Sequence, residues 1–168
     1  MSNNEEEHVL CCDQLKVGEI RSLLSRYPLE TQRVEAKQTI PGSYWGESEA
    51  GIINQTIYFR PDTPVHSLLH ETCHVICMDQ ERRSQLHTDA GGETDEEDAV
   101  CYLQILLADE LNGFGKARAL LDMDRWGYSF RLGSAKKWFE QDAEDAREWL
   151  LHHRLIDESE QPTYQLRT

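Results

Sequence analysis

The chain has 168 residues, with 17 Lys and Arg against 31 Asp and Glu, and its formal net charge at pH 7 is −14. This length suits one domain that buries its own core. Nucleic-acid and anionic-membrane binders depend on clustered basic residues, so the charge argues against both kinds of partner. The sequence contains no apolar run of about 18 residues and begins without the basic and apolar regions of a signal peptide. We therefore expect a cytoplasmic protein.

The cysteines are predicted to be free thiols. Their number is odd, two of them are adjacent, and no spacing resembles a disulfide framework or the paired CxxC of a zinc ribbon. The five are Cys11, Cys12, Cys73, Cys77 and Cys101. We expect Cys73 and Cys77 to be small buried core residues.

The N-terminal third is predicted to contain one helix followed by short strands. Residues 1–8 are acidic and are expected to form a disordered tail. Apolar residues at helical spacing over 15–27 predict a helix that ends at Pro28. Residues 31–39 alternate loosely, and 52–60 are so rich in β-branched and aromatic residues that they form the clearest predicted strand.

A helix is predicted to follow directly after this strand. Thr63 can be its N-cap, and Pro64 suits the first helical position because that position needs no N–H donor. The apolar pattern then continues to residue 78, and a polar, glycine-containing loop is expected over 79–93.

The rest of the chain is predicted to be helical. Thr94, followed three residues later by Glu97, matches a capping box and precedes an apolar helix over 98–111. Further helices are expected over 116–123 and 134–153, with a tail over 158–168 that is expected to be disordered. We find no repeat or linker, so residues 1–168 are predicted to form a single domain.

The segment His70-Glu71-Thr72-Cys73-His74 is an H-E-x-x-H motif. Residues i and i+4 share one helix face, so both imidazoles can bind one Zn²⁺. Zinc lowers the pKa of a bound water to about 7, and a carboxylate is then a sufficient base. Glu71 is therefore the candidate that accepts a proton from that water and passes it to a leaving amine.

A catalytic zinc site needs a third protein ligand and an open fourth position. Our candidate is Glu96, because helical spacing places it on the same face as Ala99 and Leu103, which we expect to pack against the motif helix. Glu97 and Glu93 remain alternatives, with Glu97 also expected to be the capping-box partner of Thr94.

Strand, motif helix, loop and second helix together resemble a minimal gluzincin, closest to the bacterial ImmA/IrrE-type zinc peptidase domain. The second helix of that family reads roughly E-x-x-A-x-x-F-A-x-x-L-L, and five positions here match it: Glu96, Ala99, Tyr102, Leu106 and Leu107. The resemblance covers about residues 50–110. It implies a zinc-dependent endopeptidase with a small mixed sheet over two central helices, in which the strand over 52–60 pairs with an extended substrate.

Peptide hydrolysis also needs a donor for the oxyanion of the tetrahedral intermediate. Tyr128 is our candidate because it lies in a glycine-flanked loop beside an aromatic residue. The alternatives are His87, His66 and Arg131, and packing of Tyr128 as a core aromatic is the competing role for this residue.

Together these features predict an α+β, zincin-like domain with a small β-sheet, the motif helix, a glutamate-bearing helix and a helical C-terminal extension. The predicted function is zinc-dependent hydrolysis of a peptide or protein substrate, with Zn²⁺ held by His70, His74 and Glu96. Two alternatives stay open: a catalytically silent zinc-binding interaction module on the same scaffold, and an acidic helical adaptor in which the motif is coincidental. The sequence predicts no particular substrate or oligomeric state.

Overall fold

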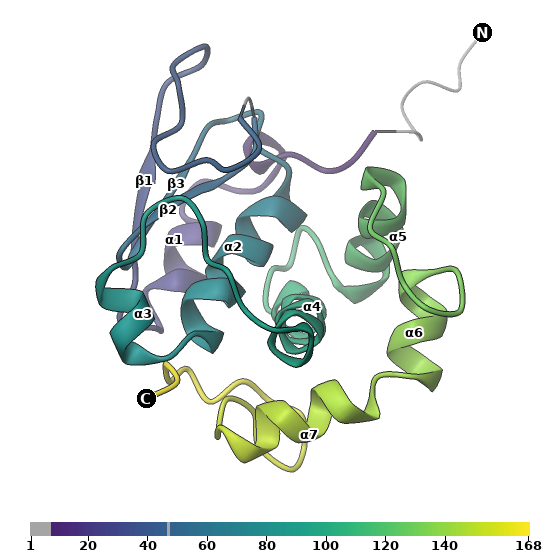
Figure 1. Cartoon of the computed structure of the whole chain (residues 1–168). Coiled ribbons are helices and arrows are strands. Elements are labelled where there is room, and N and C mark those ends of the chain that lie inside the picture. The colour runs from purple at the N-terminus through teal and green to yellow at the C-terminus, as the bar shows by residue number, and fades with distance from the viewer. Residues whose placement is uncertain (1–7, 47) are drawn as a thin grey trace, which may run out of the picture.

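The computed structural model describes residues 8–46 and 48–168, and these residues form an α+β fold. Figure 1 shows a small sheet on one side of two central helices, α2 and α4, with α5, α6 and α7 on the other side. The predicted α+β class is confirmed. Of the expected tail over 1–8, only His8 lies within the described residues.

The sheet has the order β1-β3-β2, with β1 (Glu30–Arg33) parallel and β2 (Gly51–Ile53) antiparallel to the central β3 (Thr56–Phe59). The single strand expected over 52–60 is therefore wrong. Asn54 has a left-handed φ of +53°, which asparagine tolerates better than most residues, and it begins a tight turn between β2 and β3.

The outer edge of β2 is already paired. The N–H of Ile52 donates to the carbonyl of Gly42 at 3.2 Å, and the N–H of Thr88 donates to the carbonyl of Ile52 at 3.0 Å. Because β3 is central and β2 is covered at this point, the segment over 52–60 offers no free edge at Ile52 to a substrate strand. The implied pairing of an extended substrate is not available there.

Two buried helices form the centre of the fold. The motif helix α2 (Val65–Cys77) packs most extensively against α4 (Thr94–Ala108), and apolar residues on all sides of both are buried. In both helices the observed N-cap lies one residue away from the predicted one, at Pro64 in α2 and at Glu93 in α4. Thr63 instead accepts a hydrogen bond from the N–H of Arg60 at 2.9 Å, which leaves Pro64 at the N-cap of α2.

One expected helix is shorter than predicted, and one short helix was not predicted. The helix expected over 15–27 is shortened to α1 (Glu19–Leu24), whose N-cap Gly18 adopts a left-handed φ of +84°, and a single 3-10 turn, η1 (Cys12–Gln14), precedes the expected range. The loop expected over 79–93 contains a short helix, α3 (Gln80–Ser84), whose N-cap Asp79 accepts a hydrogen bond from the N–H of Arg82 at 2.9 Å.

The C-terminal part is helical, as predicted, but it is divided differently. The elements are α5 (Lys116–Trp126), α6 (Ala135–Gln141) and α7 (Glu144–His152), so the helix expected over 134–153 breaks between Gln141 and Glu144. Residues 158–168, expected to be disordered, return to the end of α2, where the N–H of Arg167 donates to the carbonyl of Ile76 at 3.0 Å (Figure 1).

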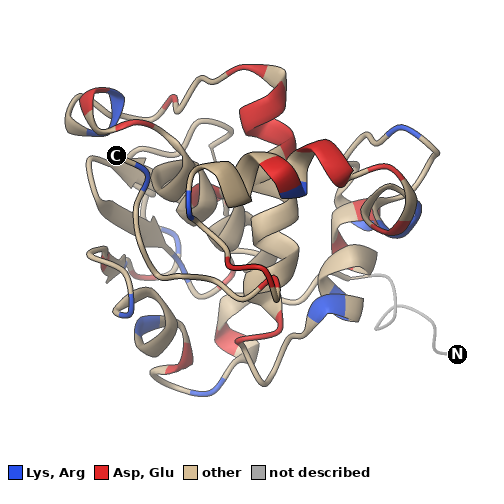
Figure 2. Cartoon of the chain, turned by 90° about the horizontal axis from the view of Figure 1, so that it is seen from below, with Lys and Arg blue, Asp and Glu red and all other residues tan. Residues whose placement is uncertain are grey.

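All five cysteines are free, as predicted, and Cys73 and Cys77 are fully buried in the core. Among the described residues, no helix has the length and apolar character that a membrane crossing requires. Figure 2 shows acidic residues on many helices and loops, with fewer basic residues between them, which agrees with the net charge of −14.

Candidate metal centre

Three side chains from α2 and α4 converge on one point. Nε2 of His70 and Nε2 of His74 are 3.1 Å apart, and each lies 3.2 Å from a different carboxylate oxygen of Glu97. The two histidines share a face because they are one helical turn apart, and α4 brings Glu97 across from them. These three residues form the group that could hold a metal ion within the part of the chain that the structure describes.

The glutamate that the structure brings to the two histidines is Glu97 and not the predicted Glu96. Glu96 is buried on another side of α4, where the guanidinium of Arg82 binds both of its carboxylate oxygens at 2.8 Å. Arg167 approaches the same carboxylate at 3.0 Å. The third candidate, Glu93, is the N-cap of α4 and does not join the cluster.

Glu97 was expected to close a capping box with Thr94, and the start of α4 explains why it does not. Glu93, not Thr94, is the N-cap, and no side chain caps the helix. The carboxylate of Glu97 is therefore released from the backbone and reaches the histidines instead.

A buried glutamine orients His70. The amide nitrogen of Gln104 donates to the carbonyl of His66 at 2.8 Å, and a carbonyl can only accept. The amide oxygen of Gln104 therefore faces Nδ1 of His70, at 2.9 Å, and Nδ1 must carry the proton. In the neutral ring, the form that binds a metal, the lone pair is then on Nε2, the atom that faces His74 and Glu97.

The cluster fits the coordination geometry of zinc. Bond lengths of about 2.0–2.1 Å and tetrahedral angles place neighbouring ligand atoms roughly 3.3 Å apart, close to the observed 3.1–3.2 Å. Burial lowers the pKa of His74 to about 4, which favours the neutral form that binds metals. Nδ1 of His74 has no hydrogen-bond partner among the described residues. Of the two histidines, only His70 therefore has its ring oriented by a hydrogen bond at Nδ1.

Glu71 lies beside the cluster and lines the same cleft as His70 and Glu97. Burial raises the pKa of Glu71 to about 7, and the nearby carboxylates of Glu49 and Glu97 add to this shift. A carboxyl group with a pKa near neutrality can both accept and return a proton. The placement of Glu71 is therefore compatible with the acid–base role predicted for it.

Tyr128 lies beside His70, with the two rings perpendicular and their centroids 5.5 Å apart, and it lines a cavity that also includes His70 and Glu71. Its hydroxyl lies 3.2 Å from Nδ1 of His66 and accepts from the amide of Gln104 at 3.3 Å. Burial raises the pKa of Tyr128 to about 12 and lowers that of His66 to about 3, so the tyrosine is protonated and the histidine is neutral. In this structure Tyr128 supports the residues behind the cluster.

The other candidates for oxyanion donor lie away from the cleft. His66 is fully buried beneath Tyr128. His87 is exposed and contacts Thr88, and Arg131 is exposed and pairs with Asp142 at 2.6 Å. Neither His87 nor Arg131 lines the cavities beside the cluster.

Two cavities adjoin the cluster and share Trp45, His70, Glu71 and Glu97 in their walls. The larger, of about 420 Å³, continues to Glu49 and is called the Glu49 cavity below. The smaller, of about 210 Å³, continues to Asp89 and is called the Asp89 cavity. The cluster thus lies where two open pockets meet.

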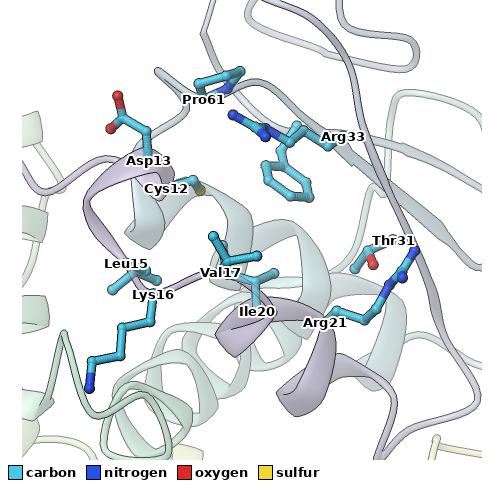
Figure 3. Close-up of a pocket in the computed structure, with 12 residues that line it drawn as sticks. Cys12, Asp13, Leu15, Lys16, Val17, Ile20, Arg21, Thr31, Arg33 and Pro61 are labelled. Carbon is cyan, nitrogen blue, oxygen red and sulfur yellow. The ribbon is translucent and has the colours of Figure 1, made fainter.

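Another cavity, of about 340 Å³, lies between η1, α1 and the end of the sheet (Figure 3). Its walls include Cys12, Ile20, Arg21, Thr31 and Arg33, and none of the cluster residues. It therefore has no part in the candidate metal centre.

Comparison with known proteins does not assign this site to a family. A scan against protein-family models and searches of curated proteins and of solved structures find no match to this chain.

Proposed function

We propose that this protein is a zinc-dependent peptidase with a zincin-type fold, similar to the gluzincins, and that it acts on a peptide or protein substrate. One observation carries the proposal: the ligand atoms of His70, His74 and Glu97 converge at tetrahedral spacing, with Glu71 beside them in an open cleft. A purely structural zinc site is normally closed by four protein ligands, whereas this cluster has three.

His70, His74 and Glu97 would hold the ion, and Gln104 keeps Nε2 of His70 available to it. Bound zinc would supply Lewis-acid polarisation of the attacking water and of the peptide carbonyl. Glu71 accepts one proton of the water as its oxygen adds to the carbonyl carbon. Glu71 then donates that proton to the amine nitrogen as the C–N bond breaks, and its side chain is again an ionised carboxylate.

A role for Tyr128 as oxyanion donor remains part of the proposal. Its hydroxyl stays protonated at neutral pH because burial raises its pKa to about 12. Donation to a substrate would require the hydroxyl to leave His66. We expect this exchange only when a substrate carbonyl offers a stronger acceptor, since hydrogen bonds to developing charge are the stronger ones.

Metal analysis together with one variant tests the proposal. Purified protein should contain one zinc per chain. The Glu71→Gln variant should keep the zinc but hydrolyse a mixed peptide library at least about 100-fold more slowly than the wild type. Glu81→Gln is the matched control, because Glu81 is an exposed glutamate on α3 outside both cavities. Absence of zinc, or unchanged hydrolysis by Glu71→Gln, would contradict the proposal.

A catalytically silent zinc-binding module is the second candidate. The observation that favours it is the position of the Tyr128 hydroxyl, which is bonded to buried groups. Stoichiometric zinc with no cleavage of any peptide, in the wild type and in Glu71→Gln alike, would support this alternative.

A further inference from the structure

The Glu49 cavity contains a fixed carboxylate beside the metal centre. One oxygen of Glu49 accepts a hydrogen bond from Nε1 of Trp126 at 2.7 Å, and the other accepts from the hydroxyl of Ser67. The hydroxyl oxygen of Ser67 in turn accepts a hydrogen bond from the N–H of Ala50 at 3.0 Å. The carboxylate is thus fixed between the loop before β2, α2 and α5, while each oxygen keeps a lone pair free.

Among the described residues that line the two cavities, no Lys or Arg balances this carboxylate. The described residues that line the Glu49 and Asp89 cavities include Glu49, Glu71, Asp89 and Glu97, and none of them is Lys or Arg. A divalent ion would offset only part of this charge. The cleft therefore attracts a further positive group from a ligand.

Two exposed tryptophans complete the walls of the Glu49 cavity. The exposed fraction of Trp45 is 76% and that of Trp126 is 43%, which is unusual for such large aromatic residues. Indole faces attract ammonium and guanidinium groups and also cover the apolar stem of a long side chain. The cavity volume of about 420 Å³ lies within the range of natural ligand pockets, about 300–1,000 Å³.

We propose that the Glu49 cavity is a specificity subsite that takes a Lys or Arg side chain of the substrate, adjacent to the peptide bond that is cleaved. Glu49 is its specificity-determining residue, and Trp45 and Trp126 cover the stem of the basic side chain. This inference rests on the proposed peptidase function, because His70, Glu71 and Glu97 line the same cavity.

Peptide binding to the zinc-loaded Glu71→Gln protein tests the subsite without cleavage. The probes are blocked hexapeptides that differ at one central position, which is Lys, Arg, norleucine or Glu, and affinity is measured by calorimetry and by tryptophan fluorescence. The Lys and Arg peptides should bind about tenfold more tightly than the norleucine peptide. Equal affinities, or no binding of any of the peptides, would overturn the proposal.

When Glu49→Gln is added to the Glu71→Gln protein, the ratio of its affinities for the Lys and norleucine peptides should fall to less than about twofold. Glutamine keeps an acceptor for Trp126, so the wall is expected to stay in place. Glu81→Gln is the matched control: it removes one charge from an exposed position on α3 outside both cavities and should leave the preference unchanged. A Lys preference that Glu49→Gln leaves intact would overturn the role of Glu49.

Trp45→Leu provides a second variant that does not depend on the hydrogen bonds of Glu49. The Trp45 side chain is exposed and stacks edge-on against Tyr44, so its replacement should not disturb the core. It should lower the affinity for the Lys peptide about threefold and that for the norleucine peptide less. An equal loss for both peptides would contradict a cation-binding role for Trp45.

Different experimental results would contradict the proposed subsite and the proposed peptidase function. Cleavage without any preference for Lys or Arg would remove the subsite and leave the peptidase function standing. A Lys preference that depends on Glu49, combined with no cleavage by the wild-type protein, would remove the peptidase function and leave a binding site for basic peptides.

Discussion

Gln104 and His70 are joined across α2 and α4 by a hydrogen bond of 2.9 Å between Oε1 and Nδ1. Gln104 lies seven residues after Glu97, two helical turns along the same face, and it is fully buried. One face of α4 therefore supplies both a ligand and the group that orients another ligand. The candidate metal centre depends on how these two helices are packed, and not on the motif alone.

Gln104→Leu should weaken zinc binding by roughly 10–100-fold, the usual cost of losing the hydrogen-bond partner behind a histidine ligand. Leucine leaves Nδ1 of His70 without an acceptor, so the ring is free to rotate or to change tautomer. Competition with a chromogenic chelator at pH 7 measures the affinity. Gln141→Leu, at an exposed position at the end of α6, is the control, and an affinity loss of similar size in both variants would contradict the orienting role.

Glu97→Gln and Glu96→Gln should separate metal binding from stability. Glu97→Gln should lose more zinc affinity than Gln104→Leu, because it changes a ligand directly. Glu96→Gln should change zinc affinity less than about threefold but lower the free energy of unfolding by about 1–3 kcal/mol, since Arg82 and Arg167 lose the charge they share. Zinc titration and urea denaturation measure the two effects. Loss of zinc by Glu96→Gln alone would restore the original ligand assignment.

The sequence identified the motif helix and its histidines because that argument is local. Positions i and i+4 share a face in any helix, and the turn at Pro61–Pro64 fixes where α2 begins. The choice between Glu96 and Glu97 is not local. It requires knowledge of which face of α4 meets α2, and α4 is apolar on every side, with Val100, Leu103 and Ile105 all fully buried. The apolar pattern therefore could not select a face.

One signal in the sequence did mark the correct face. Gln104 is polar within an otherwise apolar part of α4, and a buried amide needs hydrogen-bond partners. Its spacing of seven residues from Glu97 places both on the same face. No comparable signal marks Arg167, which reaches Glu96 from 71 residues away and orders the tail that local composition predicted to be loose.

Arg167→Gln should lower the free energy of unfolding by about 1–2 kcal/mol. The Arg167 side chain contacts both the carbonyl of Cys77, at 3.2 Å, and Glu96, so it connects the tail to the end of the motif helix. Arg154→Gln, at an exposed position, is the control. In a double-mutant cycle, Arg167→Gln and Glu96→Gln should be non-additive by about 1 kcal/mol, and strict additivity would show that the ion pair contributes nothing.

Glu71→Gln should stabilise the metal-free protein at pH 8 but not at pH 5. Burial raises the pKa of Glu71 from 4.5 to about 7 in the folded state. Between these values the folded state binds more protons than the unfolded state, so wild-type stability falls as the pH rises through this window. Above pH 7 the full cost of ionising the buried carboxyl group remains, about 3 kcal/mol. Glutamine has no charge to bury and avoids this cost.

Urea denaturation of chelator-treated protein at the two pH values measures this difference. The free energy of unfolding of Glu71→Gln minus that of the wild type should be below about 1 kcal/mol at pH 5 and about 3 kcal/mol at pH 8. Taking the difference removes the contribution of every other titrating group. Glu81→Gln, at an exposed position on α3, should give no pH-dependent difference. Equal differences for Glu71→Gln at both pH values would mean that Glu71 ionises as freely in the fold as in water, and the carboxyl group would then lack the near-neutral pKa on which its proposed proton transfer depends.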